Sequence, residues 1–304
     1  MTTMINVNGV ISPAHEATVS VLDHGFLFGE GVYEVCRTYH GLPFLFDRHT
    51  RRLRESAARL ALPVPFMDGE IRDRVDDTVD AAELGTTDSP SAYVRLLLTR
   101  GVGEISYDPS GCPNPTLVVI AKKYVPPGRD VYELGVRIAM VATVRNHPAS
   151  LNPLIKSNNL LNNALAMQEA LRQGAFEALM HNHRGELAEC SQSNLFVVKA
   201  GSISTPPLDA GLLAGITRAY LFEIANDLGM TASEVPLRDE DLLSADEAFL
   251  TSSTREIVPV VLVNEHRIGT GHPGPVTRAL LDGYRQRVEA LTKNGRDNQS
   301  AFSV

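Results

Sequence analysis

One short stretch of this chain is incompatible with a regular helix or strand, and it divides the sequence into two parts. Residues 123–129 read Lys-Tyr-Val-Pro-Pro-Gly-Arg, and two prolines followed by a glycine end regular structure. The chain has 304 residues, of which 43% are hydrophobic, which is ample for one large domain or two smaller ones. We therefore expect a small domain at 1–122, an interdomain loop at 123–133 and a larger domain at 134–292.

Residues before this break predict an α+β unit. Asn8-Gly9 favours a tight turn between two short strands, and Val32 to Tyr39 is rich in β-branched and aromatic residues, as strands are. The expected elements are a hairpin at 4–11, strands at 32–39, 44–46, 91–98 and 116–122, and a helix at 48–62.

Strands and helices are also expected after the break. Helices that are followed by Gly174 and Gly229 have a typical stop signal. The expected elements are strands at 136–144, 176–180, 195–199 and 248–251, and helices at 158–173, 217–228 and 276–291. The polar residues 293–304 predict a disordered tail.

Composition excludes several classes of function. The net charge is −8 with both signs scattered along the chain, so a nucleic-acid partner is not expected. Cys36, Cys112 and Cys190 are isolated, so neither a disulfide framework nor a zinc site is indicated. We see no signal peptide and no apolar run of the ~20 residues that span a bilayer. His181-Asn-His183 is expected to be part of a hairpin turn, and no metal site is predicted.

Lys156 stands out because the residues around it carry no charge. Leu154 and Ile155 precede it, and no charged residue follows until Glu169. A lone lysine is usually a solvated surface residue. Apolar surroundings, however, disfavour the charged form of an amine and make it a usable nucleophile. We therefore predict a reactive lysine at position 156.

A candidate partner group lies at Glu189, within residues 185–196. Ser191, Ser193 and Asn194 are short polar side chains that could orient this carboxylate. It is either an acid at a hairpin edge or a ligand for the ring nitrogen of a pyridine cofactor, where a carboxylate favours the protonated ring.

A candidate anion cradle lies at residues 213–218, which read Leu-Ala-Gly-Ile-Thr-Arg. Gly215 lets the backbone approach an anion, and the N–H groups of Ile216 and Thr217 would face it at a helix start. The hydroxyl-rich turn at 251–255 could complete the cradle or be an ordinary turn, and Arg52 could pair with the same anion. A lysine, a carboxylate and an anion cradle are the groups that pyridoxal 5'-phosphate (PLP) chemistry requires.

Together these motifs resemble the class IV aminotransferases, which are the fold-type-IV PLP enzymes, over residues 4–285. This family includes branched-chain aminotransferases, D-amino-acid aminotransferases, (R)-selective amine transaminases and aminodeoxychorismate lyase. The motifs occur in the order of the family at 28–34, 49–53, 156–163, 189–194, 205–207, 215–218 and 251–256. The resemblance implies an α+β enzyme with a small N-terminal α/β domain and a larger C-terminal α/β domain, and a homodimer. The isolated cysteines and the lack of a signal peptide or membrane span indicate a reducing compartment, so we expect a cytoplasmic protein.

The resemblance also implies roles for single residues. Lys156 is the Schiff-base lysine and proton shuttle, and Glu189, with Asn194 beside it, holds the ring nitrogen. Cofactor contacts are implied for Arg52, Leu213, Gly215, Ile216, Thr217, Ser252 and Ser253, and substrate contacts for Tyr33, Arg95, Ser253 and Thr254. The expected reaction is a ping-pong transfer of an amino group between an amino acid and a 2-oxo acid.

The motifs that bear on the substrate resemble two different groups of the family, the branched-chain and the D-amino-acid enzymes. Branched-chain enzymes carry a tyrosine five residues after the lysine, where this chain has Leu161, as the D-amino-acid group does. The loop at 102–109 lacks the Arg-x-His carboxylate trap of that group. Tyr93-Val-Arg95 instead resembles the Tyr-x-Arg of branched-chain enzymes. We favour branched-chain L-amino acids, with D-amino acids or (R)-amines as the alternative and aminodeoxychorismate cleavage as a second alternative.

Overall fold

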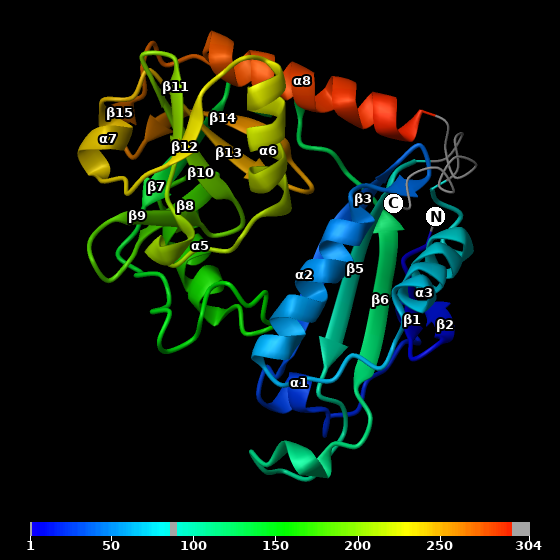
Figure 1. The fold of residues 1–304 in the computed structure, drawn as a ribbon. Helices are drawn as coiled ribbons and strands as arrows, with labels where there is room; N and C mark the ends of the chain where they lie inside the picture. Colours follow the sequence, from blue (N-terminus) through cyan, green and yellow to red (C-terminus); the bar gives the residue numbers. More distant parts are fainter. Residues whose placement is uncertain (1, 86–89, 294–304) are drawn as a thin grey trace. The chain divides into compact units, whose positions relative to one another are not determined.

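The computed structural model describes residues 2–85 and 90–293, which form two compact units. Among the described residues, unit 1 contains 2–85 and 90–125, together with 155–159 and 287–293. Unit 2 contains 126–154 and 160–286. The division at Val125 falls within the Pro-Pro-Gly stretch, and the short segment with Lys156 belongs to unit 1. Figure 1 shows the elements of both units.

Unit 1 is built on an antiparallel sheet with the strand order β2-β1-β6-β5-β3-β4. The strands are β1 (Met4–Val7), β2 (Val10–Pro13), β3 (Gly31–Tyr39), β4 (Leu42–Pro43), β5 (Ala92–Thr99) and β6 (Thr116–Lys123). The helices are α1 (His24–Leu27), α2 (Phe46–Arg59) and α3 (Asp68–Ala81), with a 3₁₀ turn at Pro109–Gly111.

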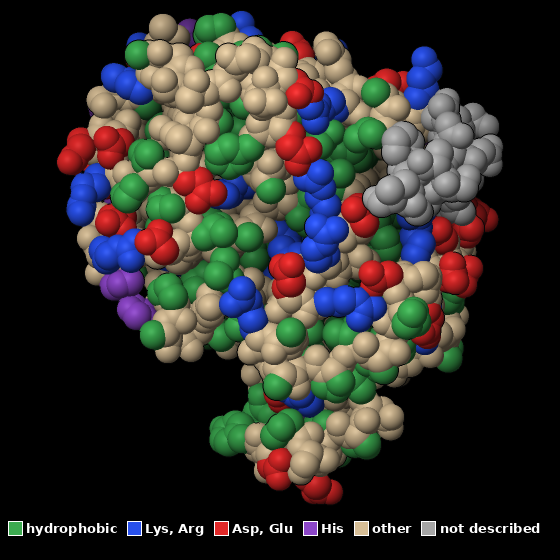
Figure 2. All heavy atoms as spheres, in the orientation of Figure 1, with side chains coloured by type: hydrophobic (Ala, Val, Ile, Leu, Met, Phe, Trp, Pro, Cys, Tyr) green, Lys and Arg blue, Asp and Glu red, His purple; other side chains and the backbone are tan. Residues whose placement is uncertain are grey.

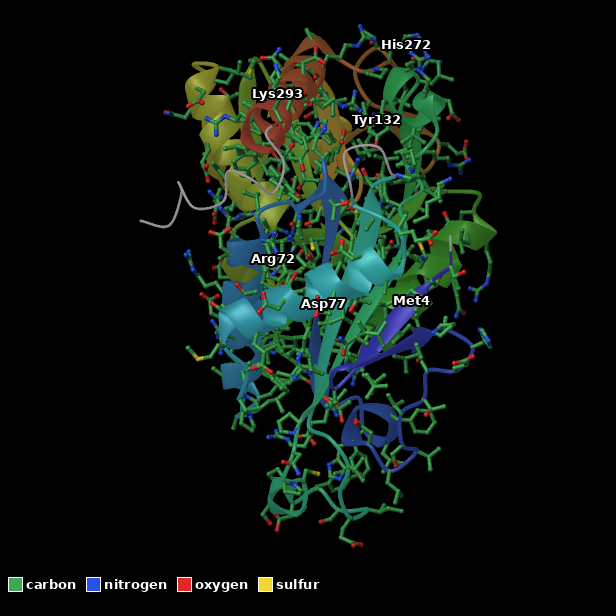
Figure 3. The ribbon with its side chains drawn as sticks, turned by 90° about the vertical axis from the view of Figure 1, so that its right-hand side faces the viewer. Met4, Arg72, Asp77, Tyr132, His272 and Lys293 are labelled. Atoms are coloured by element: carbon green, nitrogen blue, oxygen red, sulfur yellow. The ribbon has the colours of Figure 1, made fainter. Side chains whose placement is uncertain are left out.

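The two faces of this sheet differ. Side chains alternate along a strand, and Val32, Leu96 and Leu98 pack against Leu53 of α2 and Val75 of α3 in a continuous core. Figure 3 shows α3, with Arg72 and Asp77, lying across this face of the sheet. The neighbouring positions of β3 and β5 point to the opposite face and are partly exposed.

Unit 2 contains a mixed sheet with the strand order β12-β11-β10-β13-β14-β7-β8-β9, and β15 pairs with β14. The strands are β7 (Val136–Met140), β8 (Glu177–His181), β9 (Leu187–Cys190), β10 (Asn194–Lys199), β11 (Ser202–Thr205), β12 (Ala232–Glu234), β13 (Glu247–Ser252), β14 (Glu256–Val263) and β15 (His266–Arg267). The helices are α4 (Arg129–Glu133), α5 (Leu161–Arg172), α6 (Ile216–Asp227) and α7 (Asp239–Leu243), with a 3₁₀ turn at Leu208–Ala210. The last helix, α8 (Pro275–Thr292), begins in unit 2, and its residues from 287 belong to unit 1.

Different side chains cover the two faces of this sheet. Ile138, Leu179 and Leu195 belong to a large aliphatic core. Ala166 and Ala170 of α5 pack with Ala139 and Ala178 of β7 and β8 in a second cluster. The small side chains of the second cluster let α5 lie close to the strands.

The α+β expectation is confirmed, as are the N-terminal hairpin and most predicted strands and helices. The strand predicted at 44–46 was wrong, because β4 is Leu42–Pro43 and Phe46 already begins α2. The helix predicted from Asn158 begins at Leu161, because the preceding residues pair with β3. The strand predicted at 136–144 ends at Met140. The predicted disordered tail falls outside the described residues, apart from its first residue.

Candidate active site

Lys156 is held by its backbone in unit 1. Its carbonyl oxygen accepts a hydrogen bond from Tyr33 N at 2.9 Å, and its N–H donates to Ser56 Oγ of α2 at 3.1 Å. Ser157 forms an antiparallel bridge with Val32, and Asn158 N donates to the carbonyl oxygen of Gly31 at 2.9 Å. This segment is therefore a short extension of the sheet, which fixes the position from which the lysine side chain extends.

The Lys156 side chain lies over an aromatic ring. Its Nζ is 4.4 Å from the centroid of the Tyr33 ring, and Arg95 Cζ is 4.1 Å from the same centroid. Cations at these distances from a ring are attracted by its quadrupole. All three side chains are partly exposed, so the desolvation that we expected for Lys156 is only partial. The structure thus brings three predicted residues together on one face of the sheet.

Arg52 belongs to a buried charge cluster that sequence reasoning missed. Its Nε and Nη2 donate to Glu34 at 2.7 and 2.8 Å, and His49 Nδ1 lies 2.6 Å from the same carboxylate. Burial raises the pKa of Glu34, but the charge of Arg52 and the contact with His49 outweigh it and hold this pKa well below its usual range. Burial lowers the pKa of His49, so its neutral ring donates through Nδ1.

A sequence signal for this cluster exists. Glu34 stands among β-branched residues in a buried strand, and a buried carboxylate needs partners. His49 and Arg52 are three residues apart on α2 and so share a helix face. Glu34 therefore fixes the orientation of the Arg52 guanidinium. A phosphate could contact Arg52 only in that orientation.

Glu189 is the centre of a polar cluster in unit 2. Arg145 Nε donates to its Oε1 at 2.8 Å. The backbone N–H of Leu213 and the Nδ2 of Asn194 approach its Oε2 at 3.1 and 3.3 Å. The Glu189 carboxylate is buried, and one guanidinium and two neutral donors contact it, which satisfies the need of a buried carboxylate for partners. Sequence reasoning missed Arg145, although it is the only Asp, Glu, Lys or Arg between Arg137 and Lys156.

Asn194 joins this cluster to the start of α6. Its Nδ2 also donates to the carbonyl oxygen of Leu213 at 3.0 Å. A Cβ placed on Gly215 would overlap Asn194 Oδ1, so any other residue at this position requires Asn194 to move. Gly215 is the N-cap residue, and no side chain caps the helix. The N–H groups of Ile216 and Thr217 at the first turn are consequently suited to an anion.

The turn after β13 has buried hydroxyl groups. Thr251 is the strand partner of Asn194, and among the described residues neither its Oγ1 nor the Oγ of Ser252 has a hydrogen-bond partner. Arg255 anchors the turn, because it donates to Glu177 at 3.1 Å and to Gln192 at 2.9 Å. Buried polar groups without partners are costly, so these hydroxyls suit a polar ligand. Together with the uncapped helix start, they fit the phosphate of PLP.

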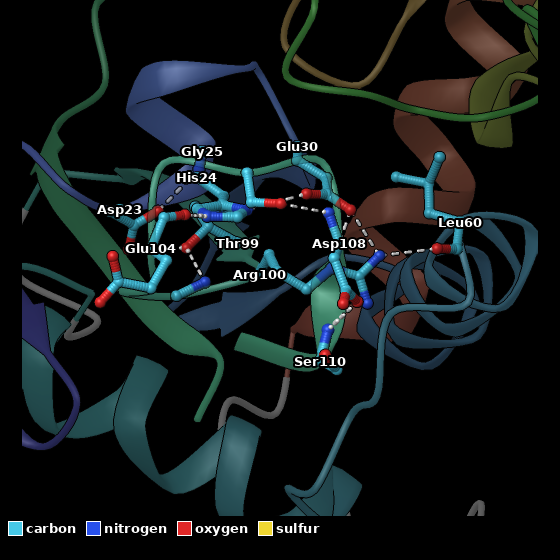
Figure 4. Close-up of polar contacts among 12 residues, drawn as sticks. Asp23, His24, Gly25, Glu30, Leu60, Thr99, Arg100, Glu104, Asp108 and Ser110 are labelled. Carbon is cyan, nitrogen blue, oxygen red and sulfur yellow. Dashed lines mark hydrogen bonds and ion pairs between the residues drawn. The ribbon is translucent and has the colours of Figure 1, made fainter. Parts of the chain in front are cut away.

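Arg100 is a further cation, at the start of the loop that follows β5, and Figure 4 shows its contacts. Arg100 Nε donates to Glu30 at 2.8 Å, and its Nη1 and Nη2 donate to the carbonyl oxygens of Ala61 and Leu60 at 2.7 and 2.8 Å. His24 Nε2 holds the carbonyl oxygen of Glu104 at 2.9 Å. Arg100 is therefore a structural residue.

The same loop exposes apolar side chains. Ile105 and Tyr107 are 72% and 89% exposed, and Figure 2 shows hydrophobic and acidic side chains at the lowest part of the view, where this loop lies. No described residue of the segment 102–109 is basic, so the loop offers no cationic side chain to a substrate.

The cysteines and His181 could also carry chemistry, but the cysteines are buried and His181 is paired with a carboxylate. The cysteines are free and buried; burial raises the pKa of Cys36 to about 12 and also raises the pKa values of Cys112 and Cys190. His181 pairs with Asp239 at 2.6 Å beside the predicted hairpin turn. Within residues 2–85 and 90–293, no group of three or more His, Cys, Asp or Glu side chains could hold a metal ion. Over the same residues, no helix has the length and apolar character of a membrane span.

The predicted site residues fall into two sets, each described by itself. Unit 1 carries Tyr33, Arg52, Arg95 and Lys156. Unit 2 carries Glu189, Asn194, Leu213, Gly215, Ile216, Thr217, Ser252, Ser253 and Thr254. Ser253 and Thr254 lie in the partly exposed turn between β13 and β14.

Comparisons with known proteins agree on one family. A family model described as amino-transferase class IV matches residues 31–263. A predicted branched-chain-amino-acid aminotransferase of Methanocaldococcus jannaschii is 37% identical over 92% of this chain and 95% of its own length. D-alanine aminotransferase of Staphylococcus haemolyticus is 33% identical over 95% and 99%. The structure of the branched-chain aminotransferase of Thermoproteus uzoniensis with norvaline has a TM-score of 0.87 and 30% identity, covering 97% of each chain.

Proposed function

Because the chain belongs to the class IV aminotransferases, we propose that it transfers amino groups from branched-chain L-amino acids to 2-oxo acids with PLP as its cofactor. Class IV aminotransferases use PLP, and the structure supplies the amine, the carboxylate and the anion-binding groups that this cofactor needs. When bound, PLP supplies an aromatic ring that withdraws electrons from the substrate. The other proposed roles belong to side chains and backbone groups of the protein.

Lys156 carries the covalent chemistry and the proton transfer. Its Nζ is the amine that would hold the cofactor covalently, and the same amine, when free, would accept and return a proton. The Tyr33 ring and the two backbone hydrogen bonds of Lys156 restrict where this amine can move. Such restriction contributes to catalysis, because less orientational freedom is lost in the transition state.

The remaining proposed contacts hold the cofactor. Glu189 would accept the N–H of the pyridine ring of PLP, and Leu213 would contact that ring. The backbone N–H groups of Ile216 and Thr217 and the hydroxyls of Ser252 and Ser253 bind the phosphate, as does Arg52. The unpartnered hydroxyl of Ser252 and the uncapped start of α6 support this assignment.

The proposed substrate rests on the position of Arg95. Its guanidinium lies 4.1 Å from the centroid of the Tyr33 ring that Lys156 also contacts, and none of the described carboxylates pairs with it. A substrate carboxylate would satisfy it with charge-assisted hydrogen bonds. Arg100, in contrast, is committed to Glu30 and to two carbonyl oxygens. Arg95 is therefore our proposed ligand for the carboxylate of the substrate, and Tyr33, Ser253 and Thr254 are proposed as further substrate contacts.

A half-reaction without an amino acceptor tests the substrate. The protein is loaded with PLP and mixed with L-leucine or with D-alanine, and the visible absorption band of the bound cofactor is followed. Loss of the band with L-leucine alone is the expected result. Loss with D-alanine alone would overturn the branched-chain assignment and favour the D-amino-acid alternative, to which the D-alanine relatives point. Pyruvate release from aminodeoxychorismate without an acceptor would reveal a lyase.

We also propose a homodimer, which the resemblance to the family implies, and a cytoplasmic location, which the isolated cysteines indicate. Sedimentation of the PLP-loaded protein at micromolar concentration tests the first, and a single monomeric species would contradict it. Fractionation of the source cells tests the second.

A further inference from the structure

Glu189 has little capacity left for a ligand. A carboxylate offers about four acceptor positions on its two oxygens. Asn194 and Leu213 approach Oε2, and Arg145 Nε approaches Oε1 at 2.8 Å. One further donor can therefore be accepted, which matches a single N–H group of a cofactor ring.

Arg145 is the charged member of these three donors. Its side chain is 8% exposed and that of Glu189 is 7% exposed, so solvent screens their attraction only weakly. Its Nη1 donates to Asn162 Oδ1 at 3.0 Å, and Asn162 Nδ2 donates to the carbonyl oxygen of Val144 at 2.8 Å. The guanidinium is thus fixed from both sides and contacts Glu189 through one nitrogen.

The effect of this cation follows from electrostatics. When Glu189 accepts an N–H from a ring nitrogen, one proton is shared between a nitrogen and a carboxylate oxygen. A positive charge beside the carboxylate disfavours protonation of the nearer oxygen more than protonation of the more distant nitrogen. The proton therefore remains on the ring nitrogen, where it makes the ring an electron acceptor.

We propose that Arg145 is a positioning residue that keeps Glu189 ionised, so that the proton shared with the PLP ring stays on the ring nitrogen. This inference rests on the proposed function, because it assigns Glu189 to the ring nitrogen. It adds a residue that sets the electronic state of the cofactor through Glu189 and touches neither the substrate nor the reacting atoms.

The test follows the ring proton directly. PLP labelled with ¹⁵N in its ring is bound to the wild-type protein and to the variants Arg145→Met, Arg145→Gln and Arg145→Lys, and the ¹⁵N chemical shift is measured at neutral pH. The wild type and the lysine variant should show a protonated ring nitrogen. The methionine and glutamine variants should shift toward the unprotonated value, and their kcat should fall roughly tenfold or more with little change in KM. Arg145→Gln keeps a neutral donor, so it separates the charge from the hydrogen bond.

Controls separate this inference from loss of folding and from the proposed function. Arg184→Met removes a more exposed arginine that pairs with Glu186 at 2.7 Å, and it should keep the wild-type shift. A protonated ring in folded Arg145→Met or Arg145→Gln protein would overturn the role of Arg145 while the proposed function stands. A wild-type protein that binds no PLP, or a Glu189→Gln variant with an unchanged ring shift, would instead overturn the assignment on which this inference rests.

Discussion

Lys156 and Arg95 lie on the same aromatic ring, with Nζ and Cζ at 4.4 and 4.1 Å from the centroid of Tyr33. Two cations so close to one ring would repel each other, and the attraction of each to the ring offsets part of this cost. The tyrosine therefore positions the proposed reactive amine relative to the proposed carboxylate ligand. Both cations extend from backbone that hydrogen bonds to β3.

The role of the Tyr33 ring is testable by keeping or removing its aromatic face. Tyr33→Phe should retain the positions of both cations and most of the activity. Tyr33→Leu should lower kcat/KM by about fivefold or more, because each cation–π contact is worth roughly 0.5–1 kcal/mol at partly exposed sites. Steady-state kinetics with L-leucine checks this expectation, and equal losses in the two variants would point to the hydroxyl group instead.

Arg95→Met should weaken binding of the substrate without releasing PLP. Loss of a hydrogen bond to a charged group costs about 1.5–3 kcal/mol, so KM for amino acid and 2-oxo acid should rise roughly tenfold to a hundredfold. Lys122→Met is a matched control, because Lys122 Nζ is a cation 4.9 Å from the Tyr93 ring of the same sheet. An unchanged KM in Arg95→Met would remove this residue from the substrate site.

Glu34→Gln should destabilise unit 1, because it leaves Arg52 buried without its charge partner. Breaking a buried pair costs about 3–5 kcal/mol, which denaturant unfolding at neutral pH measures. The depressed pKa of Glu34 stabilises the fold at pH values above the unfolded value of 4.5, and this contribution is lost as pH falls through the lower folded pKa. The variant should lack this acid-dependent part of the stability curve, and an unchanged curve would contradict the assignment.

Gly215→Ala should disturb the Glu189 cluster. The added Cβ overlaps Asn194 Oδ1, so Asn194 must move and its contacts with Glu189 and Leu213 must weaken. PLP affinity, measured by fluorescence titration, should fall about tenfold, which corresponds to one hydrogen bond of ~1 kcal/mol plus strain. Gly69→Ala is the control: its Cβ meets no atom within 4 Å, and PLP affinity should not change.

The sequence predicted the family, which is confirmed, more fully than it predicted the local structure. Lys156, Glu189 and Gly215 lie in short motifs, and their residue types already indicate the groups that PLP needs. α3 escaped notice because polar side chains surround its apolar stripe at Ile71, Val75 and Val79. β14 escaped notice because Pro259 interrupts its apolar run, although the strand lies inside the sheet.

The sequence did not predict which charged residues pair with each other. Arg52 meets Glu34, 18 residues away, and Arg145 meets Glu189, 44 residues away. These pairs depend on how α2 packs on β3 and on where the loop after β7 runs, and neither is a local property. The paired positions on β3 and β5 likewise place Arg95 and Tyr33 on one face through the strand register.

Borohydride reduction tests the central claim most directly. Reduction of the PLP-loaded protein converts the bond between the cofactor and its lysine into a stable amine, and mass spectrometry of the digested protein locates the label. We expect the label on the peptide with Lys156, and no label in Lys156→Ala. A label on Lys122, Lys123, Lys199 or Lys293, or a Lys156→Ala variant that still turns over, would contradict it.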